Sequence, residues 1–394
     1  MRRLNKLLNS SKLIPLINAL IKSEKNVFNE LIKDLKYALD EFNKVKGTED
    51  ELIKKIKSSK TSWLTAIPIE SLNDTKPVCE VAKNYSVIAV DGSQIMPDRH
   101  EVRLCYLINI GYVIFNYGKN SNAELKSEPT LYFNEDDLYK EYGGIKTLIS
   151  AKDITFKRTI MEYNKVAECI SRVEDENKIA FIDGTLIEWM VQGDPNEQFI
   201  IDNILTTFDT AQKFNTPIVG YISSPKSNDF INMLRISLCP QDFVNCNNCP
   251  YLKNDKSLPC SMINKINDAD LFLKILKNGE RSPLFLSTSH ILENYGDHKI
   301  AFFYLNTGYE IARIEIPYWV ANDKRNLDLV HFICYDQSKK GNGYPISLSE
   351  AHEQAVVTGA DRDLFYNILS NLYVKNGIKI SRSYKTQRKR SSIL

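Results

Sequence analysis

The sequence predicts an α/β protein in which a mixed sheet is flanked by helices. Short runs of β-branched and aromatic residues, which are typical of buried strands, fill residues 85–133 and recur up to residue 316. Helical periodicity dominates residues 1–60 and the chain beyond residue 324. A run of strands followed by alternating helices and strands favours a sheet with both parallel and antiparallel pairs.

The first 60 residues are predicted to be helical. Apolar residues recur at helical spacing from Phe28 to Phe42, with Lys and Glu between them. A second, shorter helix is expected to begin at Thr48, which is followed by acidic residues. This pattern indicates a helical arm or a packing surface and contains no residues arranged for chemistry.

Two predicted strands each end in an aspartate followed by a glycine. The first covers residues 85–90 and runs into Asp91-Gly92; the second covers residues 178–182 and runs into Asp183-Gly184. We expect each glycine to let the chain turn sharply where the sheet opens to solvent. Carboxylates on neighbouring strands can converge there, and converging carboxylates attract a divalent cation.

The other predicted elements connect and follow these strands. We expect a β-hairpin between Val102 and Tyr117, with its turn near residue 111, and a long helix over residues 152–175. The remaining patterns predict helices near 197–213, 230–238, 268–277, 324–336, 348–358 and 362–374, and strands at 130–133, 217–222, 300–305 and 310–316.

The Asp-Gly-Thr that follows the second strand also occurs in haloacid-dehalogenase phosphatases, whose nucleophilic aspartate lies two positions earlier. Phe181 occupies that position before Asp183, and Ala89 occupies it before Asp91. Neither side chain can attack phosphorus, which excludes this class. Phosphodiester hydrolysis with bound cations remains, because cations can activate water and neutralise charge on the phosphate.

A third carboxylate is expected from the helix between the two acidic strands. Glu162 and Glu168 each lie beside apolar residues, whereas Glu174 belongs to an acidic run and looks solvated. The residues alone leave all three as ordinary helix charges.

A late segment contributes two further candidates, Tyr344 and His352. Tyr344 lies in a Gly-Tyr-Pro sequence that predicts a tight turn, and Ser347 or Ser349 can cap a helix that carries His352. Near a helix start the dipole would keep the imidazole neutral, as a metal ligand requires.

In this order, Asp91-Gly-Ser, Asp183-Gly, Gly343-Tyr344-Pro345 and Ala351-His352 resemble the NurA nucleases over roughly residues 85–360. The resemblance implies a ribonuclease-H-like core that degrades DNA with Mn²⁺ or Mg²⁺. It also implies a homodimer, and a HerA-type hexameric ATPase as partner in processing DNA ends.

The same resemblance assigns the site residues. It implies that Asp91, Glu162, Asp183 and His352 hold the cations and that Tyr344 completes the catalytic set. Glu162 fits the helical glutamate of the family because Arg158 precedes it in the expected place, and Glu168 remains its rival.

On this interpretation the chain has an N-terminal helical region (1–80), a nuclease domain (81–378) with a cysteine-rich insert (239–260), and a basic tail (379–394). The competing hypothesis is a non-catalytic DNA-binding or assembly subunit of a HerA-type complex.

The insert contains four cysteines, Cys239, Cys246, Cys249 and Cys260. Cys-x2-Cys is a usual half-site for tetrahedral metal binding, and two further thiolates complete four ligands. We expect Zn²⁺ or an iron–sulfur cluster with a structural role, ordering a loop beside the DNA path. The other four, Cys79, Cys105, Cys169 and Cys334, lie in apolar contexts and are expected to be core thiols.

The net charge is only +2, so the chain as a whole is not a polycation. Basic residues nevertheless dominate the C-terminal tail, which has no acidic residue after Asp363. Such tails often contact phosphates, although they can equally be solvated and bind nothing. The candidate DNA-binding residues are Lys226, Arg235, Lys324, Arg325, Arg388, Lys389 and Arg390.

The N-terminus resembles a signal peptide only weakly, because Pro15 and Asn18 interrupt its apolar run and no small-residue cleavage site follows. No apolar run approaches the length of a membrane span. We therefore expect a cytoplasmic protein, in which free thiols are normal.

Overall fold

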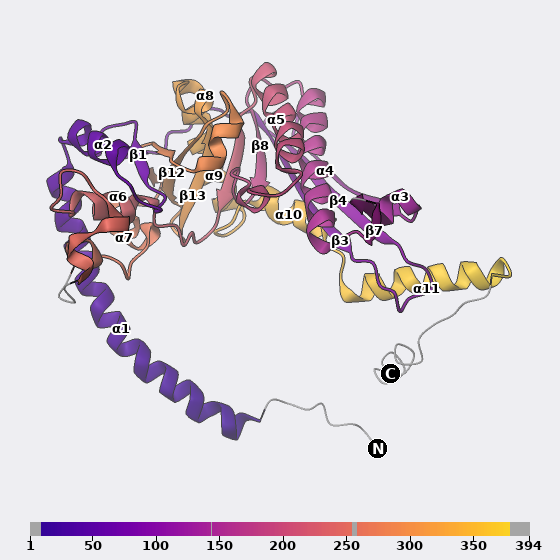
Figure 1. Ribbon diagram of the computed structural model, residues 1–394. Helices are drawn as coiled ribbons and strands as arrows, with labels where there is room; N and C mark the ends of the chain where they lie inside the picture. Colours follow the sequence, from indigo (N-terminus) through magenta and orange to yellow (C-terminus); the bar gives the residue numbers. More distant parts are fainter. Residues whose placement is uncertain (1–8, 143, 254–257, 379–394) are drawn as a thin grey trace. The chain divides into compact units, whose positions relative to one another are not determined.

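The computed structural model describes residues 9–142, 144–253 and 258–378. The chain forms two compact units, each assembled from three separate segments (Figure 1). Unit 1 comprises Met1–Pro77, Ser224–Ser289 and Phe302–Arg313, and unit 2 comprises Val78–Ser223, His290–Ala301 and Ile314–Leu394. The N-terminal helices therefore pack with the segment that contains the four clustered cysteines.

Unit 2 carries a mixed sheet with the strand order β5-β4-β3-β8-β9. The strands are β3 (Tyr85–Ile95), β4 (Tyr106–Tyr117), β5 (Asn122–Tyr132), β8 (Lys178–Asp183) and β9 (Ile218–Ile222). β3, β4 and β5 pair antiparallel, whereas β8 is parallel to both β3 and β9. The predicted mixed sheet is confirmed.

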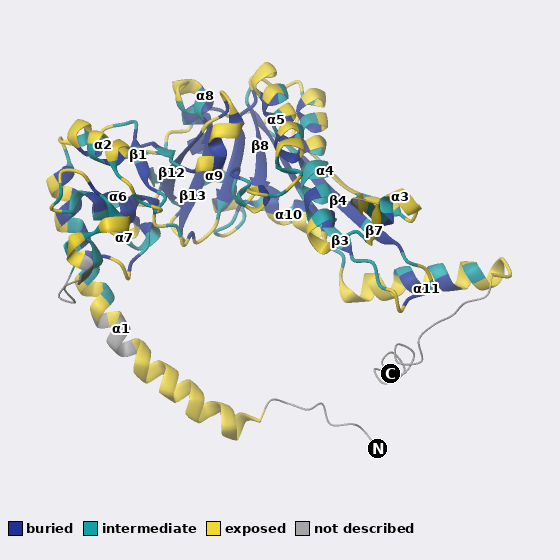
Figure 2. Cartoon of the chain, in the orientation of Figure 1, coloured by how far each residue is buried: buried dark blue, intermediate teal, exposed yellow. Residues whose placement is uncertain are grey.

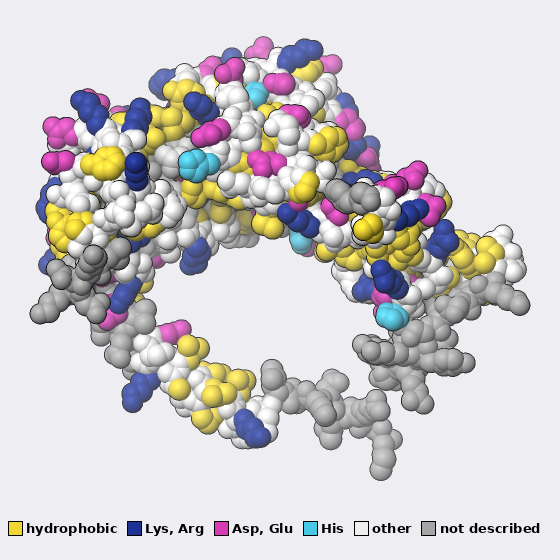
Figure 3. Space-filling model, in the orientation of Figure 1, with side chains coloured by type: hydrophobic (Ala, Val, Ile, Leu, Met, Phe, Trp, Pro, Cys, Tyr) yellow, Lys and Arg dark blue, Asp and Glu magenta, His cyan; other side chains and the backbone are white. Residues whose placement is uncertain are grey.

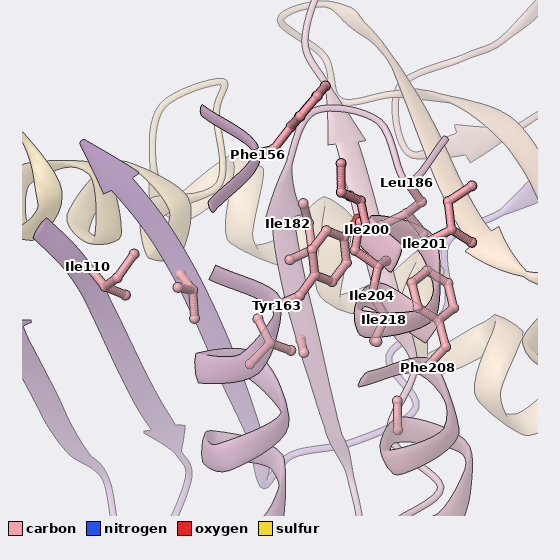
Figure 4. Packing of buried hydrophobic residues seen from close by; sticks show 14 of the residues in the cluster. Ile110, Phe156, Tyr163, Ile182, Leu186, Ile200, Ile201, Ile204, Phe208 and Ile218 are labelled. Atoms are coloured by element: carbon pink, nitrogen blue, oxygen red, sulfur yellow. The ribbon is translucent and has the colours of Figure 1, made fainter. Parts of the chain in front are cut away.

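The central residues of the two acidic strands are apolar because both faces of the sheet are covered. On β3, Val87, Ile88, Ala89 and Val90 are all buried. Helices α4 (Ala151–Arg172) and α5 (Glu197–Lys213) pack against each other and onto one face. Figure 4 shows how residues of both helices and of the strands interdigitate in this core.

Helix α10 (Ile346–Ala355) covers the opposite face of β3 and β4. A Cβ placed on Gly111 of β4 would lie 2.2 Å from the backbone nitrogen of Ala355, whereas one placed on Gly92 of β3 would meet α4 side chains. Both glycines therefore permit close approach of a helix to the sheet.

Two turns predicted in this region are wrong, because Gly92 and Gly111 both lie inside strands. β3 continues through Asp91 and Gly92 to Ile95, and β4 is a single strand through Gly111. The hairpin is formed by β4 and β5 instead. Gly184, by contrast, has φ of +99° and does allow the predicted turn after Asp183.

Unit 1 contains the predicted N-terminal helices, α1 (Ser10–Val45) and α2 (Glu49–Ser58), together with α6 (Asp229–Ser237) and α7 (Asp268–Ile275). Its core is rich in aromatic residues, among them Phe42, Phe230, Phe272 and Tyr304. The C-terminal half of α1 belongs to this core, whereas its N-terminal half is exposed (Figure 2). Apolar side chains such as Leu16 and Leu20 lie along that exposed half (Figure 3).

The remaining elements are shorter or complete the two units. They are β1 (Ala66–Pro68), β2 (Lys76–Pro77), α3 (Glu135–Leu138), β6 (Tyr139–Tyr142), β7 (Ile145–Leu148), β10 (Glu280–Arg281), β11 (Phe285–Ser287), β12 (Ile300–Asn306), β13 (Ile311–Pro317), α8 (Tyr318–Ala321), α9 (Lys324–Lys340) and α11 (Gly359–Lys375). β12 and β13 each contain residues of both units.

Three of the four single cysteines are buried, as expected, but Cys79 is exposed. Within the described residues, no helix is both long and apolar enough to cross a membrane.

Candidate active site

Asp91 and Asp183 lie next to each other on neighbouring strands. Val90 of β3 pairs with Ile182 of β8 in parallel register, so the two aspartates follow at equivalent positions. Adjacent residues of a strand point to opposite faces, and Val90 and Ile182 both belong to the core beneath α4. Both aspartates therefore point to the other face of the sheet, the one that α10 covers.

Glu162 reaches this pair from α4, on the opposite face. Its Oε1 would lie only 2.4 Å from a Cβ on Gly92, so an L side chain at that position would displace the carboxylate. Gly92 thus opens the strand beside Asp91 for Glu162. The glycine that the sequence marked as a turn serves to bring a third carboxylate to the site.

The environment of Glu162 is electrostatically unfavourable for a carboxylate. Burial raises the pKa of Glu162 to about 8, despite the guanidinium of Arg158 one helical turn earlier. The negative charges of Asp91, Glu188 and Asp183 raise this pKa further, which places all of them close to Glu162.

The hydrogen bonding of Glu162 is also incomplete. Nε of Arg158 lies 3.0 Å from Oε1 of Glu162, yet neither atom has a hydrogen-bond partner in the described chain. Arg158 instead donates to Oε1 of Gln94 at 2.8 Å. A buried carboxylate oxygen without a donor is suited to a cation ligand.

Glu168, the rival carboxylate, lies in a different setting. Half of its side chain is exposed, and it forms ion pairs with Lys165 and Arg172 on its own helix. The structure therefore brings Glu162 to the aspartates and leaves Glu168 in solvent.

Tyr344 contacts Asp183 directly, with its hydroxyl 2.7 Å from Oδ1. Gly343 has φ of +121°, as the predicted tight turn requires, and the Tyr344 ring packs edge-on against Tyr221. Tyr221 is the β9 partner of Asp183 in the sheet. Burial raises the pKa of Asp183, while the Tyr344 hydroxyl and His352 oppose the rise.

His352 contacts Asp91, with Nδ1 2.8 Å from Oδ2. The prediction that it begins a helix is wrong, because α10 starts at Ile346 without a side-chain cap and His352 lies in its last turn. The argument that a helix start keeps the imidazole neutral therefore does not apply to His352. Neither Ser347 nor Ser349 caps the helix, since both lie inside it.

The last turn of α10 is fixed onto the sheet by side chains near Asp91. Ser93 donates to the carbonyl oxygen of Ala355 at 2.6 Å, and Asn109 donates to the same oxygen at 2.8 Å. Ser93 and Asn109 are paired across β3 and β4. These contacts and the close approach at Gly111 hold His352 beside Asp91.

Glu188 is a further carboxylate of this region that the sequence interpretation missed. It lies five residues after Asp183, and the hydroxyl of Tyr163 on α4 is 3.4 Å from its Oε1. Burial raises the pKa of Glu188 to about 7. The available signal was a lone glutamate between the apolar residues Ile187 and Trp189.

No group of three or more His, Cys, Asp or Glu side chains within residues 9–142, 144–253 and 258–378 is gathered closely enough to hold a metal ion. The donor types around Asp91 nevertheless fit a hard divalent cation, because three carboxylates and an imidazole supply oxygen and nitrogen ligands. The donor-free Oε1 of Glu162 is the atom that most clearly fits such a ligand.

The four cysteines of the insert all belong to unit 1, but within the described residues no group of three or more Cys, His, Asp or Glu side chains is gathered closely enough to hold a metal ion. Burial raises the pKa of the Cys260 thiol, and the thiols of Cys239, Cys246 and Cys249 raise it further. Backbone hydrogen bonds attach their segment to residue 60: Cys246 donates to Lys60 at 3.0 Å, and Lys60 donates to Val244 at 2.8 Å.

Arg235, a predicted DNA contact, forms contacts with other residues of unit 1. Its guanidinium lies 3.7 Å from the centre of the Trp63 ring, and it donates to the carbonyl oxygen of Cys260 and to Asn232. These contacts leave little of the group available for a phosphate.

Arg325, another predicted DNA contact, lies away from the carboxylates. Arg325 contacts Glu176 and Asn177, which precede β8, whereas Asp183 lies at the far end of that strand. Lys324 forms an ion pair with Asp328, and Lys226 is exposed in a loop of unit 1. Arg388, Lys389 and Arg390 lie outside the described residues.

The match to a known protein family covers the segment of the chain that contains the candidate active-site residues. A family model described as the NurA domain matches residues 85–357, which include Asp91, Glu162, Asp183, Tyr344 and His352. Among curated proteins, none matches the chain.

A solved structure agrees with the chain at the level of the fold. The crystal structure of the NurA nuclease from Sulfolobus solfataricus matches with a TM-score of 0.50 and 13% identity, over 94% of this chain and 98% of that one. A crystal structure of NurA bound to dAMP and manganese matches with a TM-score of 0.37 and 13% identity, over 89% and 94% of the two chains. The family match spans well over half of the sequence, and the chain therefore belongs to the NurA nuclease family.

Proposed function

We propose that this protein is a metal-dependent DNA nuclease that hydrolyses phosphodiester bonds. The observation that carries the proposal is the convergence of Asp91, Asp183 and Glu162 from β3, β8 and α4, with one buried carboxylate oxygen left without a donor. The name of the Sulfolobus protein, a NurA nuclease, supports the same activity.

The side chains of the site would have different roles. Asp91, Glu162, Asp183 and His352 would hold Mn²⁺ or Mg²⁺, which supplies an activated water and neutralises charge on the phosphate. Tyr344 donates to Asp183 and so fixes the orientation of that carboxylate. When Nδ1 of His352 donates to Asp91, Nε2 of the neutral ring is left with a lone pair for a ligand or a proton.

A cleavage assay with matched variants tests this proposal. Purified protein is incubated with single-stranded and double-stranded DNA ends, with Mn²⁺, with Mg²⁺ or with EDTA. We expect nucleotide release that requires the cation and is lost in Glu162→Gln but retained in Glu168→Gln, the exposed glutamate of the same helix. Cation-dependent DNA binding without cleavage would instead support a non-catalytic subunit.

The physiological setting is part of the proposal. We propose that the protein forms a homodimer and processes DNA ends together with a HerA-type hexameric ATPase. The exposed apolar side chains on the N-terminal half of α1 offer a surface for such contacts, with Leu16 67% and Leu20 56% exposed. Light scattering of the protein alone, and co-elution with a HerA-type ATPase, would test both contacts.

We further propose that Cys239, Cys246, Cys249 and Cys260 bind Zn²⁺ or an iron–sulfur cluster as a structural site. The effect of the other three thiols on Cys260 supports it. So does the Arg235 guanidinium, which opposes the rise that burial causes in the pKa of the Cys260 thiol. Elemental analysis and the visible absorption spectrum distinguish zinc from iron. We expect Cys246→Ser to lower the solubility or stability of the protein before it affects DNA cleavage. A variant with all four cysteines replaced by Ser that is stable, free of metal and normally active would contradict this proposal.

A further inference from the structure

The segment that follows Asp183 is fastened to the rest of unit 2 by a buried glutamate. Glu315 lies on β13, in the part that belongs to unit 2, and is 1% exposed. Its Oε2 accepts a hydrogen bond from the Thr185 hydroxyl at 2.7 Å and another from the Leu186 backbone nitrogen at 2.9 Å. A buried carboxylate is costly unless donors compensate it, and here the donors belong to the turn that leaves the catalytic strand.

The same short segment is held at a second point by Tyr295. The Tyr295 hydroxyl donates to the carbonyl oxygen of Leu186 and accepts from the backbone nitrogen of Glu188, both at 3.0 Å. Thr185 Oγ1 also accepts from the backbone nitrogen of Ile187 at 3.0 Å. Every residue from 185 to 188 therefore has a hydrogen bond that fixes its place.

Close packing on β9 leaves this segment little room to shift. A Cβ placed on Gly220 would lie 2.8 Å from the carbonyl oxygen of Gly184 and 2.9 Å from Cγ of Leu186. The backbone nitrogen of Gly184 also donates to Tyr221 at 3.0 Å. The chain directly after Asp183 is therefore held by packing against β9 as well as by the hydrogen bonds to Glu315.

We infer that Glu315 is a positioning residue for the cation site, acting by fixing the segment 184–188. This inference rests on the proposed function. Asp183 precedes the segment and Glu188 ends it, so a shift of the segment would move two of the carboxylates that surround Glu162. Groups that orient ligands in this way typically contribute about 10–100-fold to metal affinity.

The experiment compares Mn²⁺ binding by calorimetry in Glu315→Ala, Glu315→Gln and Thr185→Val. Glu315→Ala removes the acceptor, and we expect its Kd for Mn²⁺ to rise by about 10–100-fold. Glu315→Gln keeps one acceptor oxygen and should lose less affinity than Glu315→Ala. Thr185→Val removes only the hydroxyl donor, is the variant most certain to fold, and should weaken Mn²⁺ binding by about threefold or more, within the range of one net hydrogen bond.

Asp268→Asn is the matched control, because Asp268 in unit 1 is likewise a buried carboxylate that accepts hydrogen bonds. Its donors include two backbone N–H groups. This substitution should lower stability without changing Mn²⁺ affinity. Folded Glu315→Ala and Thr185→Val proteins that bind Mn²⁺ like the unmodified protein would overturn the inference; if Glu315→Ala does not fold, the result for Thr185→Val decides. Because binding is measured without DNA, failure of the nuclease proposal would appear separately, as absence of cleavage by the unmodified protein.

Discussion

Asp268 in unit 1 and Glu162 in unit 2 are both buried carboxylates, but they differ in their hydrogen-bond donors. In unit 1, Asp268 accepts hydrogen bonds from the backbone nitrogens of Phe230 and Ile231 and from the Tyr304 hydroxyl. In unit 2, Oε1 of Glu162 has no donor within the described chain. Buried polar groups are usually satisfied. Oδ1 of Asp229 in unit 1 also lacks a partner, but Asp229 forms an ion pair with the buried Arg313. Oε1 of Glu162 instead lies among further carboxylates, which indicates a role outside the fold.

The surroundings of the two carboxylates differ in charge as well. Asp268 lies beside Asp229, whose charge is balanced by an ion pair with the buried Arg313. Glu162 lies among Asp91, Asp183 and Glu188, with the guanidinium of Arg158 opposing them. Unit 1 thus offsets two buried carboxylates with one guanidinium and several hydrogen-bond donors, whereas the larger group of carboxylates in unit 2 has a negative charge that a divalent cation would balance.

The largest expected effect is on chemistry in unit 2. Asp183→Asn should lower the rate of DNA cleavage by about 10³-fold or more, because it removes a charged cation ligand worth several kcal/mol of transition-state stabilisation. Its thermal stability should stay close to that of the unmodified protein. The rate is measured with Mn²⁺ at saturating DNA, and a variant with near-normal cleavage would show that Asp183 is not a ligand.

The next effect is on stability in unit 1. Asp268→Ala leaves two backbone N–H groups and the Tyr304 hydroxyl without an acceptor, which should cost about 3 kcal/mol of unfolding free energy. Urea denaturation measures this loss, while the cleavage rate per folded molecule should not change. A stable variant with impaired cleavage would reverse the contrast between the two carboxylates.

Glu162→Gln should have the opposite effect on stability. The folded-state pKa of Glu162 is about 8, above its unfolded value, so the folded state holds a proton that the unfolded state has already released. Stability of the metal-free protein is therefore lost as pH rises through this window, from about 4.5 to about 8. At pH 9 in EDTA, Glu162→Gln should be more stable than the unmodified protein by about 1–3 kcal/mol.

Two comparisons make that result decisive. The advantage of Glu162→Gln should vanish below about pH 4.5 and should shrink when Mn²⁺ is added to the unmodified protein. A Glu162→Gln protein that is less stable than the unmodified one at pH 9 would mean that the carboxylate is satisfied after all.

The smallest effect is expected for Tyr344→Phe. It removes the hydrogen bond to Asp183 and keeps the ring that packs against Tyr221. Cleavage should fall by about tenfold, equivalent to about 1.4 kcal/mol, with stability nearly unchanged. A loss as large as that of Asp183→Asn would instead assign Tyr344 a direct part in the chemistry.

Much of the fold could be predicted from the sequence because its central strands have apolar residues on both faces. The runs ending at Val90 and Ile182 are buried strands, and the helical periods near 197–213 and 268–277 correspond to α5 and α7. Asp91 and Asp183 stood out because a charge directly after a buried strand lies at the boundary of the core. The sequence indicated that the two aspartates could meet on neighbouring strands, and the parallel register of β3 and β8 places them at equivalent positions.

The parts that could not be predicted depend on contacts between distant segments. Gly92 and Gly111 look like turn residues locally, and only the approach of α4 and α10 explains them within strands. Likewise, the interval between Pro345 and His352 does not show whether the histidine begins or ends its helix. The anchoring by Glu315 joins positions 130 residues apart, which no local pattern reveals.

The central claim is that carboxylates from β3, β8 and α4 hold one divalent cation site in unit 2. The most direct measurement is anomalous diffraction from crystals soaked in Mn²⁺. We predict a manganese peak within coordination distance of Asp91, Asp183 and Glu162, and its disappearance in Glu162→Gln crystals. A peak absent from these three side chains, at Mn²⁺ concentrations that support cleavage, would contradict the claim.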